Sequence, residues 1–204
     1  MITIIDYGLG NIRAFVNVYE RLNIKTKIAH SAEDIKGATK IILPGVGAFD
    51  YAMSQLNASG MRTELEKQVL ENKIPVMGIC VGMQMLAKSS DEGILPGLGW
   101  IDGQVKLFDS SLIPYKTRLP HMGWNSISPV NNCQLLSGFT DQSRFYFLHS
   151  YYFVCHNEEN IISTTEYGIT YASAVNRDHI YGIQFHPEKS HSNGIQLLHN
   201  FAKL

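Results

Sequence analysis

Short strand-like runs alternate with segments of helical periodicity through the first half of the chain. These runs predict buried strands at Ile2–Ile5, Lys25–Ala29, Ile41–Leu43 and Ile74–Ile79. Between them, apolar side chains recur at helical spacing over Asn11–Leu22 and Met61–Glu71. Strands that alternate with helices predict a largely parallel, open α/β sheet with helices on both of its faces.

The pattern changes after about residue 94. A strand is predicted at Val105–Phe108, and the aromatic runs Arg144–Leu148 and Tyr151–Cys155 predict antiparallel additions to the sheet. A late strand at Tyr181–Phe185 and a closing helix at Gly194–Lys203 complete the pattern. The chain shows no internal repeat and no flexible linker. We therefore expect residues 1–204 to form a single α/β domain with a mixed sheet.

Composition narrows the class of protein. The chain has 204 residues, of which 45% are hydrophobic and 17% charged, and its formal net charge is −1. These values are typical of a packed globule, and they favour neither a nucleic-acid nor a membrane partner. Its three cysteines have no paired spacing, which predicts free thiols in a reducing compartment and no metal site. We expect a cytoplasmic protein that needs no cofactor.

The sequence Gly78-Ile79-Cys80-Val81-Gly82 follows the predicted strand at 74–79. A nucleophile between two glycines, on a strand-to-helix turn, is typical of a nucleophile elbow. The start of the following helix favours the thiolate, which is the attacking form of cysteine. The alternative is a buried structural cysteine in a glycine-rich turn.

A base for such a thiol stands at the end of the late strand. His186 and Glu188 are separated by Pro187, which favours an extended backbone at the residue before it. Side chains two apart on an extended backbone project to the same side, so the carboxylate can orient the imidazole towards a thiol. The alternative is a surface histidine near a helix start, with Glu188 serving the first helical turn.

A third strand end carries the glycine-rich loop Pro44-Gly45-Val46-Gly47. Such a loop presents backbone N–H groups, and the Val81 N–H follows the nucleophile directly, so Val46, Gly47 and Val81 are candidates for an oxyanion site. The alternative for the loop is a plain strand-to-helix turn. Because open α/β sheets place their sites at strand carboxyl ends, all three segments are expected to meet.

The elbow, the Pro-Gly-Val-Gly loop and the sequence Phe185-His186-Pro187-Glu188 together resemble the class I, triad-type glutamine amidotransferases. The order Cys, then His-x-Glu, is that of this family. The resemblance implies a flavodoxin-like α/β fold and a Cys80, His186 and Glu188 triad. Val81 stands where the family more often has leucine, but only its backbone N–H is needed.

Further segments resemble the glutaminase subunits of imidazole glycerol phosphate synthases. They are Asp6–Asn11, Pro120–Asn125, His149–Tyr151 and His186–Ser190. The resemblance implies hydrolysis of L-glutamine to glutamate. It also implies transfer of the ammonia to a cyclase subunit, which makes imidazole glycerol phosphate and an aminoimidazole-carboxamide ribotide for histidine biosynthesis. The two subunits would form a heterodimer.

The same resemblance assigns roles to further residues. Gln84, His149, Ser150 and Tyr151 would bind the amino-acid end of glutamine, and Gln84 does lie one helical turn after Cys80. The candidates for the partner interface are Asn11, Arg13, Met122, Trp124 and Lys189. The alternatives are a helix-capping Gln84, a solvent-facing strand edge at His149–Tyr151 and a Trp124 in the core.

Three other functions compete with this one. Asp6–Asn11 follows a strand, as a dinucleotide-binding loop does, but Arg13 stands where a third glycine is required, so NAD binding is disfavoured. A paralogous amidotransferase that supplies ammonia to a sugar-modifying synthase would carry the same elbow and triad. An inactive scaffold would not need the intact Cys80, His186 and Glu188.

Overall fold

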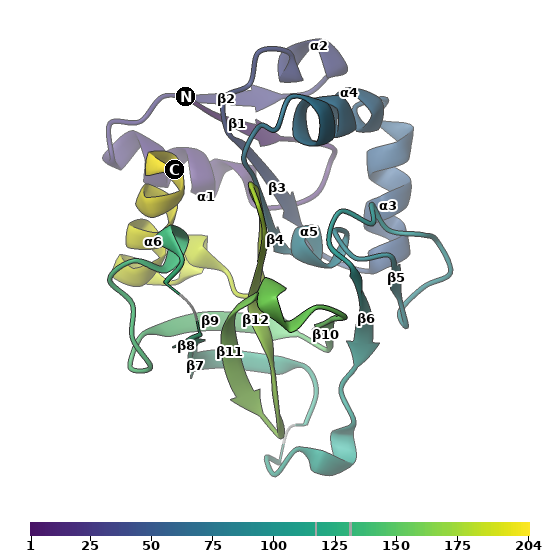
Figure 1. Ribbon diagram of the computed structural model, residues 1–204, viewed down its shortest axis with the longest axis vertical. Helices are drawn as coiled ribbons and strands as arrows, with labels where there is room; N and C mark the ends of the chain where they lie inside the picture. Colours follow the sequence, from purple (N-terminus) through teal and green to yellow (C-terminus); the bar gives the residue numbers. More distant parts are fainter. Residues whose placement is uncertain (117, 131) are drawn as a thin grey trace.

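The computed structural model describes residues 1–116, 118–130 and 132–204. Its strands form an 11-stranded sheet and a separate two-stranded sheet within these ranges. Figure 1 shows the large sheet running through the middle of the molecule, with helices on both of its sides. This confirms the predicted mixed α/β fold.

The first half of the large sheet is parallel. It consists of β1 (Ile2–Ile5), β2 (Thr26–Ala29), β3 (Ile41–Gly45), β4 (Val76–Cys80) and β13 (Ile180–Ile183). Their order is β2-β1-β3-β4-β13, with parallel pairing throughout. This is the doubly wound order of flavodoxin-like sheets, which bind ligands beyond the strand carboxyl ends. The carboxyl ends of β3, β4 and β13 therefore lie side by side.

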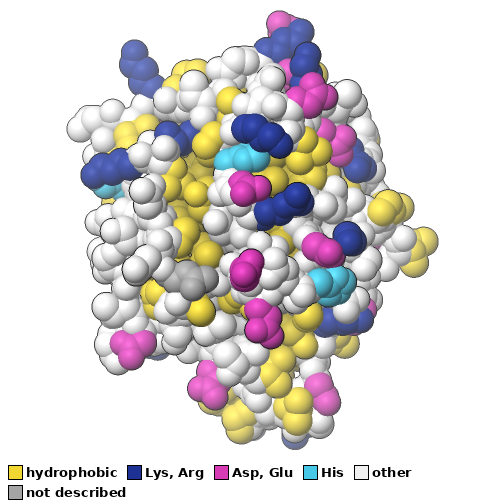
Figure 2. Space-filling view, viewed as in Figure 1, with side chains coloured by type: hydrophobic (Ala, Val, Ile, Leu, Met, Phe, Trp, Pro, Cys, Tyr) yellow, Lys and Arg dark blue, Asp and Glu magenta, His cyan; other side chains and the backbone are white. Residues whose placement is uncertain are grey.

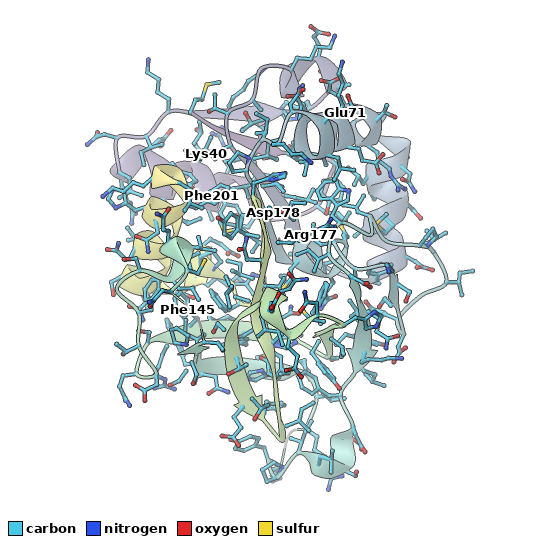
Figure 3. All side chains as sticks on the ribbon, in the orientation of Figure 1. Lys40, Glu71, Phe145, Arg177, Asp178 and Phe201 are labelled. Atoms are coloured by element: carbon cyan, nitrogen blue, oxygen red, sulfur yellow. The ribbon has the colours of Figure 1, made fainter. Side chains whose placement is uncertain are left out.

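Helices cover both faces of this half. In Figure 1, α1 (Ile12–Arg21) and α6 (His191–Lys203) lie on one side, and α2 (Ala32–Ile35), α3 (Phe49–Ala58) and α4 (Arg62–Glu66) on the other. The Tyr19 hydroxyl of α1 donates to the Leu198 carbonyl of α6 at 3.2 Å. Phe201 of α6 is fully buried against the Tyr181 ring of β13 (Figure 3).

The second half of the large sheet is antiparallel apart from its β5 edge. It contains β5 (Ser89–Ser90), β6 (Gly103–Leu107), β8 (Ser128–Pro129), β10 (Tyr151–Cys155), β11 (Ile161–Tyr167) and β12 (Ile169–Arg177). Short helices complete the fold: α5 (Val81–Gln84), η1 (Lys67–Glu71), η2 (Ser110–Leu112), η3 (Gln134–Leu136), η4 (Glu158–Asn160) and η5 (Pro187–Lys189).

One predicted strand pairs differently from the expectation. The run Arg144–Leu148 was predicted as an addition to the main sheet, and Tyr151–Cys155 does join it. However, β9 (Arg144–His149) pairs with β7 (His121–Ser126) in the two-stranded sheet. Phe145 and Phe147, the inward residues of β9, are fully buried and pack on Phe185. The small sheet therefore lies against the segment that carries His186.

Some elements were missed or shifted in the sequence pattern. Helix α3 and the β11–β12 hairpin had no predicted counterpart. The hairpin buries hydroxyl side chains, with Ser163 and Ser173 paired at 3.0 Å, so its pattern does not resemble an apolar strand. The predicted helix at Met61–Glu71 is α-helical to Glu66 and π-helical beyond it.

Two features of the structure bear on whether the chain binds a membrane or nucleic acid. No helix among the described residues is both long and apolar enough to cross a membrane. On the face shown in Figure 2, basic and acidic side chains are interspersed with each other.

A close approach of two backbones holds the turn at the end of β4. A Cβ added to Gly82 would collide with the Leu43 carbonyl of β3, and one added to Gly45 would collide with the Gly82 backbone N. A Cβ added to Gly78 would likewise collide with the backbone of α5. Helix α5 therefore lies directly on β3, which places Cys80 beside the loop that follows β3.

We predict that Gly82→Ala destabilises the fold by about 2–4 kcal/mol, because the backbone carbonyl cannot move away as a side chain would. Gly60→Ala is the matched control, since Gly60 has open space around it and only its positive φ of +72° opposes a side chain. That control should lose about 1 kcal/mol. Urea unfolding of both variants measures the difference, and equal losses would contradict this packing.

Candidate active site

Cys80 occupies a strained turn between β4 and α5. Its φ of 55° and ψ of −114° lie outside the regions that residues with a side chain ordinarily adopt. Its side chain is nearly buried, and Sγ lies 4.0 Å from the Leu148 carbonyl and 3.8 Å from Gln184 Nε2. The geometry is that of the predicted nucleophile elbow.

His186 and Glu188 form a buried pair after β13, with His186 at the N-cap of η5 and Glu188 within that short helix. His186 Nδ1 lies 2.9 Å from Glu188 Oε1, and the two side chains are 5% and 3% exposed. Since a carboxylate accepts, Nδ1 carries the proton. Burial lowers the pKa of His186, but the neighbouring Cys80 sulfur and the Glu188 carboxylate outweigh it and hold that pKa above its ordinary value. Nε2 is buried without a hydrogen-bond partner among the described residues.

A cavity of about 300 Å³ brings most of the predicted site residues together. It lies at the carboxyl ends of β3 and β4, where the β3–β4 register pairs Gly45 with Cys80. The predicted residues that line it are Val46, Gly47, Cys80, Val81, Gln84, His149, Ser150, Tyr151, His186 and Lys189. Glu188 stands behind His186. The three segments predicted to meet do meet here.

Three other lining residues were not predicted: Glu92, Pro120 and Leu148. Glu92 follows β5, and its Oε2 accepts from the Phe49 N–H at the start of α3 at 2.9 Å. It brings a carboxylate to a cavity whose other charged side chains are His186 and Lys189. Glu92 lies in a stretch with no periodic pattern, so the sequence offered no signal for it.

Gln84 is buried and is hydrogen-bonded to the backbone of β10. Its Nε2 donates to the Tyr151 carbonyl at 3.1 Å and to Gln184 Oε1 at 3.1 Å. The same carbonyl lies 2.8 Å from His149 Nδ1. Gln84 thus fixes the wall of the cavity. It does not cap α5, which was the alternative offered by the sequence.

The small sheet presents a hydrophobic outer face next to the cavity. Met122 is 60% exposed and Trp124 is 39% exposed, so Trp124 is not a core residue. Met122 is paired in register with Leu148, which lines the cavity, and Trp124 is paired with Tyr146. A continuous apolar surface therefore leads from the cavity mouth across β9 to β7.

The other predicted interface residues lie near this surface or stay untested. Lys189 lies 5.7 Å from the centre of the Tyr146 ring and also lines the cavity. Asn11 and Arg13 are exposed at the start of α1. Neither is among the residues that line the cavity.

A buried polar chain lies behind the cavity wall. Tyr171 OH is 3.1 Å from both His149 Nε2 and His121 Nδ1. Burial lowers the pKa of His121 to about 4 and that of His149 to about 3, so both rings are neutral. Because His149 Nδ1 donates to a carbonyl, Tyr171 donates to its Nε2 and accepts from His121. Asn125 completes the chain at the surface of β7.

A family model for "Glutamine amidotransferase class-I" matches residues 3–204 of this chain. The chain belongs to the class I glutamine amidotransferase family. Solved members confirm the fold. A glutamine amidotransferase structure matches 99% of this chain and 97% of its own with a TM-score of 0.74 at 19% identity. The PurLQS structure from Thermotoga maritima gives the same TM-score at 17% identity.

Relatives in the same family are much closer in sequence. An "Imidazole glycerol phosphate synthase subunit HisH" from Bdellovibrio bacteriovorus is 54% identical over 204 residues, which is 100% of both chains. A protein of the same name from Leptospira interrogans is 49% identical, and an "Imidazole glycerol phosphate synthase subunit HisH 2" from Pseudomonas aeruginosa is 48% identical. Both alignments also cover 100% of both chains. The similarity to these relatives therefore extends over all 204 residues.

The two neutral histidines make the stability of this amidotransferase depend on pH. An unfolded histidine has a pKa near 6.5, so below that pH protons bind the unfolded chain more tightly than the fold. We predict that the free energy of unfolding is highest near pH 6.5, because the raised pKa of His186 makes it fall again as the pH rises above that value. It should fall between pH 6 and 4.5, by about 1.4 kcal/mol per pH unit for each histidine.

His121→Phe tests the origin of this loss. The His121 ring stacks on the rings of Phe147 and Tyr167, with centroids 4.8 and 3.9 Å away, so phenylalanine preserves the stacking. Urea unfolding at several pH values should give the variant about half the slope of the native chain. An unchanged slope would show that other groups take up the protons.

Proposed function

We propose that this chain is the glutaminase subunit of an imidazole glycerol phosphate synthase. It hydrolyses L-glutamine to glutamate and supplies the ammonia to a cyclase subunit for histidine biosynthesis. The observation that carries the proposal is that Cys80 and His186 line one cavity, with Glu188 hydrogen-bonded to His186, in a chain of this family. The full-length relatives named as HisH support this acceptor over a sugar-modifying synthase.

The first step would form a thioester. Cys80 Sγ attacks the side-chain amide carbon of glutamine, and the negative charge on the amide oxygen faces the backbone N–H groups of Val81 and of the loop at Val46 and Gly47. The C–N bond then breaks while His186 passes a proton from Nε2 to the leaving nitrogen. The unpartnered, buried Nε2 is the atom that this step requires.

The second step would release glutamate. Water attacks the thioester carbon and gives a proton to His186, and the C–S bond breaks to return the Cys80 thiolate. Glu188 Oε1, 2.9 Å from Nδ1, accepts its proton in a hydrogen bond throughout, so Nε2 serves both steps. No metal or cofactor is needed for this sequence of bonds.

The charges of the cavity suit an amino acid. Glutamine carries an ammonium and a carboxylate group at its α-carbon. The Glu92 carboxylate would pair with the ammonium group, while the backbone of the segment His149, Ser150 and Tyr151 would bind the carboxylate. Lys189 places a positive charge on the same wall. Gln84 would act mainly by fixing Tyr151 in position.

The partner would cover the hydrophobic outer face of the small sheet. Ammonia in neutral water is mostly ammonium, which is not a nucleophile, so it must pass to the acceptor through a dry route. Leu148 lines the cavity, and Met122 and Trp124 are exposed on the neighbouring strand β7, so a partner bound over these residues would exclude water from the cavity mouth. Asn11, Arg13 and Lys189 would add polar contacts to this heterodimer.

We also propose that residues 1–204 fold as one domain in the cytoplasm. Strand β13 lies between β4 and β12, so the two halves of the chain share a single sheet. The three cysteines are free, as a reducing compartment would keep them.

We predict that Cys80→Ala abolishes glutamine-dependent synthesis of imidazole glycerol phosphate by the complex, because the thioester cannot form. Synthesis from added ammonium chloride at high pH should stay within about twofold of the native complex, because the variant still folds and binds its partner. The control is Cys155→Ala, a half-buried thiol outside the cavity, which should keep both activities. Loss of both activities in Cys80→Ala would contradict the proposal.

Trp124→Ala tests the partner surface. A half-exposed indole that a partner buries should contribute strongly, so we expect the affinity for the cyclase subunit to fall about 10- to 100-fold. The melting temperature should change by only a few degrees. Leu70→Ala, at an exposed apolar residue of η1, is the control and should bind normally. Isothermal titration with the cyclase subunit measures both, and unchanged affinity of Trp124→Ala would place the partner elsewhere.

A further inference from the structure

Gln184 is a fully buried polar residue beside the nucleophile. The β13–β4 register pairs Ile183 with Ile79, so the next residue along each strand brings Gln184 alongside Cys80. It stands two positions before His186, in the bend that follows β13, and both side chains lie against Cys80. A polar residue within the apolar run at 181–185 was the sequence signal that could have revealed it.

The hydrogen bonds around Gln184 fix which way its amide faces. The Tyr151 carbonyl can only accept, so Gln84 must turn its NH₂ group towards it. The same NH₂ group lies 3.1 Å from the Gln184 amide, which must therefore present its oxygen. The remaining atom of Gln184 is the Nε2 that lies 3.8 Å from Cys80 Sγ. The group that faces the sulfur is an N–H donor.

The sulfur consequently has two different neighbours. The Leu148 carbonyl, 4.0 Å away, can accept the S–H proton of the neutral thiol. Gln184 Nε2 can only donate, and a thiolate accepts such a bond far more strongly than a thiol does. We propose that Gln184 is a positioning residue that favours the Cys80 thiolate and holds it in place for attack, with Gln84 fixing its amide.

The other titratable groups around the Cys80 sulfur are the same in the native chain and in the Gln184 variants. His186 and Glu188 follow β13, and Tyr7 after β1 is close enough to interact with Cys80. Across the cavity stand Glu92, His149, Tyr151 and Lys189. Substitutions at Gln184 leave all of these in place, so they set a common baseline for the thiol.

The test is the pH dependence of Cys80 alkylation by iodoacetamide, followed by mass spectrometry of the peptide that contains Cys80. Gln184→Met keeps the size of the side chain but removes both the donor to the sulfur and the oxygen that accepts from Gln84. Its alkylation midpoint should rise by about one pH unit, and its rate at pH 7 should fall about tenfold. Gln184→Glu still accepts from Gln84 but places a carboxylate against the sulfur. Its midpoint should rise further.

The control is Gln68→Met. Gln68 is another buried glutamine, lies in η1 and forms hydrogen bonds with Glu64 and Asn72. Its alkylation profile should match that of the native chain, even if its melting temperature falls. A native midpoint in folded Gln184→Met or Gln184→Glu would overturn the proposal. Insoluble Gln184→Glu, which keeps both size and acceptor, would assign Gln184 to stability and overturn it as well.

This inference rests on the proposed function, since it takes Cys80 as the nucleophile, but the two can fail separately. Alkylation needs neither glutamine nor a partner. If the native chain shows no glutaminase activity with its cyclase while the Gln184 variants shift the midpoint, the proposed function fails and the positioning role holds. If glutaminase activity is present, the acid limb of kcat/KM should move with the alkylation midpoint in each variant.

Discussion

The site depends on one close approach of two backbones, where the turn after β4 crosses the end of β3. Gly82 packs on the Leu43 carbonyl, and Gly45 packs on Gly82, with no room for a side chain on either. This contact holds Cys80 in its strained conformation, with φ at 55°. It also brings the loop with Val46 and Gly47 against Cys80, so the proposed nucleophile and the proposed oxyanion donors are positioned by the same packing.

Burial determines the chemistry of the groups around that turn. His186 and Glu188 are almost fully excluded from water, so their hydrogen bond acts in a low-dielectric setting where it is strong. The imidazole is held above its ordinary pKa by its two neighbours, whereas His149, a short distance away, is held neutral because burial dominates. Two histidines beside one cavity thus differ in charge because only one has an acidic partner.

The two-stranded sheet connects the cavity to the surface. Its strands alternate, so inward residues such as His149 join the buried polar chain, while outward residues such as Leu148 and Met122 face solvent. The polar chain runs from Asn125 through His121, Tyr171 and His149 to the Tyr151 carbonyl. Gln84 Nε2 donates to the same carbonyl. The proposed substrate wall and the proposed partner surface are therefore two faces of one element.

The sequence alone determined the parallel half of the fold and the family, because strand and helix periodicities and local motifs depend on neighbouring residues. It also predicted that Cys80 and His186 would meet, since both end strands of a parallel sheet. It did not determine that β9 would pair with β7, or that Glu92 would line the cavity, because these depend on contacts between distant segments. Only the tertiary structure placed Gln184 against the sulfur, since the direction of its amide is set by a carbonyl 33 residues away in the chain, that of Tyr151.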